Sequence, residues 1–268
     1  MRVCVQGLWH LGSVTAGCLA SLGHDVTGFD FDNQTIANLQ KGTLPVSEPG
    51  LKALIEDGVT KGNLRFTENV RDAVSDVQVL WVTYDTPVDD DDQANVSFVL
   101  QEIRKTLPLL EDNTIILVSS QLPVGSIRQL EEIALKECPD KNISFCCSPE
   151  NLRLGKALSV FLHPDRVIMG VRHEEARDVL CELFEGITEN IVWMSVESAE
   201  MTKHAINAFL GMSVTFINEI AAICENVGAD AREVEAGLKT EKRIGSDAYL
   251  SPGGAFSGGT LARDLKFL

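Results

Sequence analysis

The sequence predicts an α/β protein built on a doubly wound parallel sheet and followed by a long helix. Two observations support this prediction. Short apolar runs bounded by turn residues alternate with helix-like patterns through the first 194 residues, and after that point the strand signals stop. This alternation is typical of strand–helix units that form a parallel sheet. We therefore expect one domain over residues 1–194 and a helical region over residues 195–268.

The elements follow one another in a regular order. The predicted strands are residues 3–5, 25–29, 77–82, 114–118, 143–147 and 166–170. The predicted helices between them are residues 12–22, 32–40, 98–106 and 126–136. Each parallel strand ends at the same edge of the sheet, and this carboxyl edge is where such folds bind ligands.

A long helix is predicted over residues 197–227. Its apolar residues recur at roughly helical spacing, and Gly228 stands where a helix C-terminus favours glycine. At 1.5 Å per residue the helix would be about 45 Å long. A helix of this length usually joins domains or subunits, and the alternative is an ordinary core helix.

Composition limits the partners. The chain of 268 residues carries a formal charge of −16, which opposes binding to a nucleic acid backbone. The seven cysteines are odd in number and lack C-x-x-C spacing, and the histidines lack metal-ligand spacing, so we expect reduced thiols and no metal. The start MRVCVQGL is unlike a signal peptide, and no membrane-spanning run is evident. These features predict a cytoplasmic protein that is not inserted in a membrane.

A candidate dinucleotide site follows the first strand. Residues 7–12, GLWHLG, have the spacing of G-x-G-x-x-G, with Gly7 and Gly12 at its ends. Trp9 stands where the middle glycine normally lets backbone amides approach a pyrophosphate, and His10 and Leu11 complete the loop. A strand precedes the motif and a helix follows it, which is typical of a Rossmann-like cofactor site.

An acidic residue completes this pattern. Asp30 ends the next strand, 18 residues after Gly12, where a carboxylate can bind a ribose diol and disfavour NADP. Asp32 is the weaker candidate because it can cap the next helix. NAD binding competes with one alternative, a Rossmann-like turn with only a structural role.

Several unusual strings resemble the UDP-glucose/GDP-mannose dehydrogenase family, in the family's order. The strings run along most of the chain: HDVTGFDFD at 24–32, SEPGL at 47–51, TP at 86–87, SQLPVG at 120–125, SPENLRLG at 148–155, HPDRVIMG at 163–170, AEMTKHAINAFL at 199–210 and RIG at 243–245. The end, PGGAFSGGTLARDLKFL, is similar to the family's P-G-x-G-[FY]-G-G-x-C-x-P-K-D, with Thr260 in place of the catalytic cysteine.

The resemblance implies a set of polar catalytic groups. Lys203 and Asn207 would stabilise an alkoxide, Asp264 would hold a water or pair with Lys203, and Glu150 would position water or act as a base. Each of these residues also has a purely structural interpretation: a surface ion pair, a buried amide or a helix cap.

The resemblance also implies ligand contacts. Thr86, Gln121 and Glu150 would contact the cofactor, while Arg243, Asn151 and Leu152 would contact the sugar nucleotide, with a UDP-sugar expected. In the family, the arginine that matches Arg243 reaches the sugar across a dimer interface. A homodimer formed through the long helix is therefore expected.

The departures from the family affect the residues that serve formation of the acid product. Thr260 removes the covalent thioester step, because a threonine hydroxyl is not deprotonated near neutral pH unless a base activates it, and no base is evident nearby. Leu154 replaces a second glutamate, and Gln121 replaces a threonine near the substrate. We therefore expect at most a two-electron alcohol–carbonyl oxidation. The alternative is an inactive NAD-binding or sugar-nucleotide-binding assembly subunit.

The chain is also shorter than the resemblance implies. Family members continue into the rest of a helical dimerisation region and a second α/β domain that holds the nucleotide of the substrate. We therefore expect the helical region of this chain to be incomplete and most of the UDP or GDP site to be missing.

Overall fold

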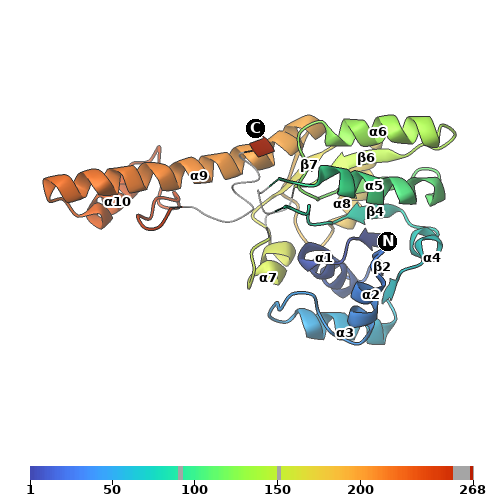
Figure 1. Cartoon of the computed structure of the whole chain (residues 1–268). Helices are drawn as coiled ribbons and strands as arrows, with labels where there is room; N and C mark the ends of the chain where they lie inside the picture. Colours follow the sequence, from blue (N-terminus) through green and yellow to red (C-terminus); the bar gives the residue numbers. More distant parts are fainter. Residues whose placement is uncertain (90–92, 150–151, 256–265, 268) are drawn as a thin grey trace. The chain divides into compact units, whose positions relative to one another are not determined.

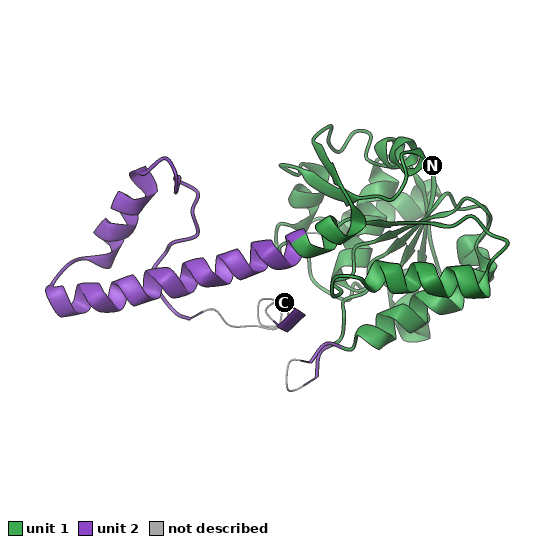
Figure 2. Ribbon diagram, turned by 90° about the horizontal axis from the view of Figure 1, so that it is seen from above, with its two compact units in different colours: residues 1–87, 95–201 green, residues 88–94, 202–268 purple. Residues whose placement is uncertain are grey.

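The computed structural model describes residues 1–89, 93–149, 152–255 and 266–267. It divides into two compact units, and the division falls inside the long helix (Figure 2). The first unit comprises residues 1–87 and 95–201, and the second comprises residues 88–94 and 202–268.

An eight-stranded sheet forms the centre of the first unit (Figure 1). Its strands lie in the order β3-β2-β1-β4-β5-β6-β7-β8. Their bounds are β1 Arg2–Gln6, β2 Asp25–Phe29, β3 Leu64–Thr67, β4 Val79–Val82, β5 Ile115–Val118, β6 Ser144–Cys147, β7 Val167–Gly170 and β8 Ile191–Met194. The strand order reverses between β1 and β4, so a crevice is expected at their carboxyl ends.

Helices cover both faces of this sheet. Their bounds are α1 His10–Ser21, α2 Asn33–Gln40, α3 Leu51–Lys61, α4 Val70–Val74, α5 Val96–Thr106, α6 Ser126–Glu137, α7 Ala157–Leu162 and α8 Glu175–Leu183, with a 3₁₀ turn at Leu107–Leu109. Helix α1 packs against α3 and α7 on one side, and α5 packs against α6.

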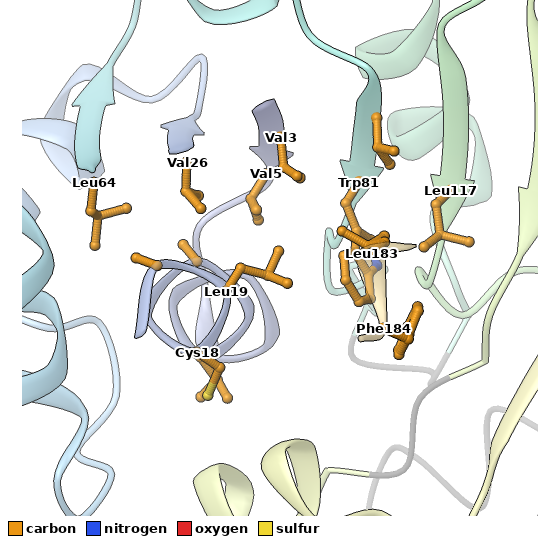
Figure 3. Close-up of a cluster of buried hydrophobic side chains, with 14 of the residues drawn as sticks. Val3, Val5, Cys18, Leu19, Val26, Leu64, Trp81, Leu117, Leu183 and Phe184 are labelled. Atoms are coloured by element: carbon orange, nitrogen blue, oxygen red, sulfur yellow. The ribbon is translucent and has the colours of Figure 1, made fainter. Parts of the chain in front are cut away.

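The main core lies between the sheet and the face that carries α1. Val3, Val5 and Val26 project from the strands toward Leu19 of α1, and all four side chains are fully buried (Figure 3). Farther along, the Trp81 ring lies 5.5 Å from the Phe184 ring. Burial of these apolar groups supplies the main driving force for this arrangement.

The α/β fold with a long helix is confirmed, with two corrections. The sequence analysis missed the two edge strands, β3 (LRFT) and β8 (IVWM), because each has only four residues and one exposed residue in its middle. The sheet is also not wholly parallel. β6 and β7 pair antiparallel through Cys147 and Gly170, while the other neighbouring strands run parallel.

The second unit is built on the long helix. Helix α9 spans Val196–Val227, one residue longer at its start than predicted, and Gly228 follows it in the left-handed conformation with φ +73°. Helix α10, Ala231–Thr240, follows after a short turn. The Asn218 amide of α9 accepts from the backbone N–H of Gly253 at 2.9 Å and donates to the carbonyl of Gly254 at 3.2 Å.

Candidate functional site

The loop after β1 has the tight geometry of a dinucleotide loop. Gly7 has φ +95°, and a Cβ on it would lie 2.7 Å from the Tyr84 ring. A Cβ on Gly12 would lie 1.8 Å from the carbonyl oxygen of Gly7. Both glycines are therefore required, Gly7 by its backbone conformation and Gly12 by the close approach of α1 to the loop.

Trp9 occupies the N-cap position of α1, and its side chain makes no hydrogen bond to the helix. Its side chain is 53% exposed, and no described side chain caps the first turn of α1. Backbone N–H groups at a helix start bind anions such as phosphates, and at this start they have no side-chain cap. An uncapped helix start of this kind fits a pyrophosphate.

Asp30 is tied to the same loop. One of its oxygens accepts from the Leu8 N–H at 2.8 Å, and the other accepts from the Asp32 N–H at 3.0 Å. Burial raises the pKa of Asp30, and these two hydrogen bonds oppose that rise. Asp32 caps α2 through Gln34 and Thr35, so its expected capping role is confirmed.

Two further expected cofactor residues meet at the carboxyl edge. The Thr86 hydroxyl, beyond β4, donates to the backbone carbonyl of Gln121, beyond β5, at 2.5 Å. Next to Gln121, the Ser120 hydroxyl is buried and has no hydrogen-bond partner among the described residues. A buried hydroxyl of this kind favours a bound polar ligand, because leaving it unpaired is unfavourable.

A buried carboxylate that the sequence analysis did not identify holds the start of α1. Glu48 accepts from the Ala157 N–H at 2.8 Å, from the Gly155 N–H at 2.9 Å, and pairs with His10 Nε2 at 3.1 Å. Its partners are up to 109 residues away in sequence, so local pattern could not reveal them. The only available signal was its place in the SEPGL string.

A second buried glutamate anchors the base of α9. Glu200 accepts from the N–H groups of Gly125 and Ile127, at 2.8 and 3.0 Å, and so caps α6 beside the loop that carries Gln121. One turn earlier, Glu197 accepts from Arg172 at 2.6 Å, and this pairing lowers the pKa of Glu197 to about 2. These contacts fix the start of α9 within the first unit.

The expected catalytic residues are only partly described. Lys203 and Asn207 lie one turn apart on α9, and Asn207 is buried. Between them His204 is buried, with its ring 5.3 Å from the Phe267 ring. The remaining expected catalytic and loop residues lie outside the described residues: Glu150, Asn151, Thr260 and Asp264.

The expected substrate residues fall in different places. Leu152 and Leu11 both line a cavity of about 90 Å³ in the first unit. Arg243, in the second unit, is exposed and pairs with Glu241 at 3.1 Å. The structure thus brings Leu152 beside the cofactor loop and leaves Arg243 in contact with solvent.

Most of the cysteine thiols are buried. Six of the seven thiols are buried, and Cys181 is exposed on α8. At the carboxyl end of β6, burial raises the pKa of Cys146 to about 12 and the pKa of Cys147 still further. Such thiols stay protonated near neutral pH and are poor nucleophiles. Within the described ranges, no three His, Cys, Asp or Glu side chains group as metal ligands.

Comparison with known families assigns the chain to a family. Residues 1–188 match the NAD binding domain of the UDP-glucose/GDP-mannose dehydrogenase family, and residues 197–268 match its central domain. The chain belongs to this family. Residues 1–188 are thus a family NAD-binding domain, as the loop geometry indicates.

Relatives support the same assignment. The chain is 35% identical to UDP-glucose 6-dehydrogenase of Rhizobium meliloti over 274 residues, covering all of this chain and 62% of that protein. It matches the structure of a UDP-glucose dehydrogenase from Pyrobaculum islandicum with a TM-score of 0.90 and 28% identity, covering 98% of this chain and 62% of that one.

A third relative comes from a ternary complex. The GDP-mannose dehydrogenase of Pseudomonas aeruginosa matches with a TM-score of 0.84 and 29% identity, covering 99% of this chain and 63% of that one. The chain thus spans about three fifths of the length of these relatives.

Proposed function

We propose that this chain binds NAD and supports oxidation of a CH–OH group in a sugar nucleotide, with a UDP-sugar as the expected substrate. The observation that carries the proposal is the loop of residues 7–12. Its glycines are required by geometry, its helix start has no side-chain cap, and Asp30 accepts a hydrogen bond from it. Family membership supports both the cofactor and the substrate class.

The proposed chemistry is one two-electron step. NAD, which the loop with Gly7 and Gly12 and the Asp30 carboxylate would hold, would supply the hydride acceptor for the carbinol carbon. Glu150 takes the hydroxyl proton, directly or through a water, while Lys203 and Asn207 stabilise the developing alkoxide. The carbonyl product is released because Thr260 cannot form the thioester that would lead to a second oxidation.

Within this function, residues 1–194 are the cofactor domain and residues 195–268 the dimerisation and substrate region. Thr86 and Gln121 are proposed to contact the nicotinamide half, because they meet at the carboxyl edge beside the buried Ser120 hydroxyl. Arg243, Asn151 and Leu152 are proposed substrate contacts. The exposure of Arg243 is consistent with a ligand or a partner subunit reaching it.

The stoichiometry of NADH production tests this proposal. With a panel of UDP- and GDP-sugars, one NADH per sugar and a carbonyl product that hydroxylamine traps are expected. Two NADH with an acid product would contradict the two-electron step. Lys203→Ala is expected to abolish turnover while leaving NAD binding unchanged.

A second candidate is a non-catalytic binding or assembly subunit. Trp9 favours it, because an aromatic side chain replaces the glycine at the pyrophosphate loop. NAD binding with no NADH formed on any sugar nucleotide would support this alternative.

We also propose a homodimer through α9. Exposed apolar side chains follow one another along this helix at Phe209, Met212, Phe216, Ile223 and Val227. A second copy in two-fold symmetry would cover the same stripe on both helices. Light scattering is expected to give twice the chain mass, and Phe216→Glu to reduce it to a monomer.

The expected absence of membrane insertion is part of the same proposal. By length and composition α9 could cross a membrane, with a mean hydropathy of 1.5 over an 18-residue window. A long helix in a water-soluble protein meets the same test, and α9 begins with Glu197, Glu200 and Lys203. We propose that the protein is cytoplasmic and that its partners are sugar nucleotides rather than nucleic acid.

A further inference from the structure

Glu48 connects three segments that are distant in sequence. It lies in the loop before α3, and its side chain is 1% exposed. One oxygen accepts from the Ala157 N–H, and the other accepts from the Gly155 N–H and meets His10 Nε2. The start of α1, the loop before α3 and the start of α7 therefore share a single carboxylate.

The contacts around Glu48 favour its charged form. Burial works against a charge, yet hydrogen bonds from Gly155, Ala157 and His10 lower the pKa of Glu48 overall. A buried carboxylate with three donors is strongly held, and removing it would leave backbone N–H groups unpaired. Helix α7 depends on it, because Lys156 at its N-cap position makes no side-chain cap.

Each end of this connection has a place in the proposed site. His10 is the first residue of α1, directly after Trp9, where the pyrophosphate is expected. Gly155 closes the SPENLRLG string that carries Glu150 and Leu152. On this basis, which rests on the proposed function, we infer that Glu48 is a positioning residue that holds the cofactor loop in register with the segment from Leu152 to Ala157.

The test is NAD affinity measured by calorimetry on the full chain. Glu48→Gln keeps one acceptor oxygen and replaces the other with an N–H₂ group, so at least one of the Gly155 and Ala157 N–H groups loses its acceptor and the link between the starts of α1 and α7 is weakened. We expect NAD binding about tenfold weaker, since small misplacements of a binding group are costly. Glu131→Gln is the matched control, because it removes a carboxylate bound to Arg172 at 2.9 and 3.0 Å in the same unit.

A double-mutant cycle separates positioning from general stability. If Glu48 acts through His10, the effect of His10→Ala on NAD affinity should largely disappear in the Glu48→Gln background. Additive effects would overturn the inference. It would also be overturned if Glu48→Gln lowered the melting temperature, as Glu131→Gln should, but left the NAD affinity unchanged.

Two further results need their own interpretation: a Glu48→Gln variant that does not fold, and a wild-type chain that does not bind NAD. Should Glu48→Gln fail to fold, amide hydrogen exchange in His10→Ala replaces the cycle, and faster exchange at Gly155 and Ala157 is expected. Unchanged exchange there would contradict the coupling. A wild-type chain that binds no NAD would overturn the proposed function together with this inference, whereas normal wild-type binding with unaltered variants would overturn the inference alone.

Discussion

Two helices in the first unit are capped at their N-termini by glutamates that are distant in sequence, and the pKa values of these two glutamates shift in opposite directions. Glu48 caps α7, and Glu200 caps α6. At Glu48, three hydrogen-bond donors outweigh burial and lower the pKa. At Glu200, burial outweighs two backbone donors, the nearby Glu197 adds to the effect, and the pKa rises. The same capping geometry can thus stabilise a charge or disfavour it, depending on its other neighbours.

The largest effect we expect is on folding stability. Glu48→Ala should destabilise the protein by about 3 kcal/mol, because it leaves two backbone donors and His10 without a buried partner. Glu200→Ala should cost about 2 kcal/mol, since only two backbone donors lose their partner. Urea unfolding of both variants measures the difference. Equal losses would mean that His10 adds nothing to the cap of α7.

The next effect concerns the start of α1, beside the Glu48 contact. Trp9→Gly should strengthen NAD binding about tenfold, because a glycine lets backbone amides approach the pyrophosphate. Stability should change little, since the Trp9 side chain is largely exposed and glycine is an acceptable N-cap residue. Calorimetry with NAD tests this prediction. Weaker binding would show that the Trp9 ring itself contacts the cofactor.

The opposite pKa shifts predict opposite pH dependences. The folded-state pKa of Glu48 is depressed, so its stabilisation is present above the ordinary value of 4.5 and is lost as the pH falls through the folded pKa. The folded-state pKa of Glu200 is raised, so its contribution is greatest at low pH and declines as the pH rises from 4.5 through the folded pKa.

Unfolding free energies of wild type, Glu48→Gln and Glu200→Gln across this pH range provide the measurement. The stability difference between wild type and Glu48→Gln should grow with rising pH, and the difference for Glu200→Gln should shrink. Curves that change in the same direction would contradict the contrast between the two caps.

The smallest effect is at the ion pair beside Glu200. Glu197→Gln should cost about 1 kcal/mol near neutral pH, because partly exposed ion pairs contribute little. Its pKa of about 2 means that this contribution is retained down to acidic pH and is lost between about pH 4.5 and 2. Acid titration of unfolding, with 1 M salt as a control for screening, measures it.

Much of the fold follows from local pattern. The strands 25–29 and 143–147 and the helix 126–136 were predicted within a residue or two of their observed bounds, because they are apolar runs or amphipathic stretches with clear turn residues. Strands β3 and β8 were missed, because an edge strand of four residues has little pattern of its own. The antiparallel pairing of β6 with β7 joins Cys147 to Gly170, and residue periodicity does not encode the relative direction of two strands.

The site was predicted unevenly for a related reason. Gly7, Gly12 and Asp30 were predicted because a dinucleotide loop needs fixed spacing, and the structure shows the tight turn and the contact of Asp30 with the loop. The contact between Thr86 and Gln121 was not predicted, although both residues were named, since it joins the ends of two strands. Glu48 was quoted as part of a motif and given no role, because all three of its partners are distant in sequence.

The sequence alone determined the alternation of strands and helices and the long helix. These depend on residue type, spacing and periodicity, which are local properties. Only the tertiary structure decided that Trp9 is exposed, that His10 meets Glu48, and that two distant glutamates cap α6 and α7. The physical reason is that burial and hydrogen bonding depend on which segments meet in space, and chain folding sets those meetings.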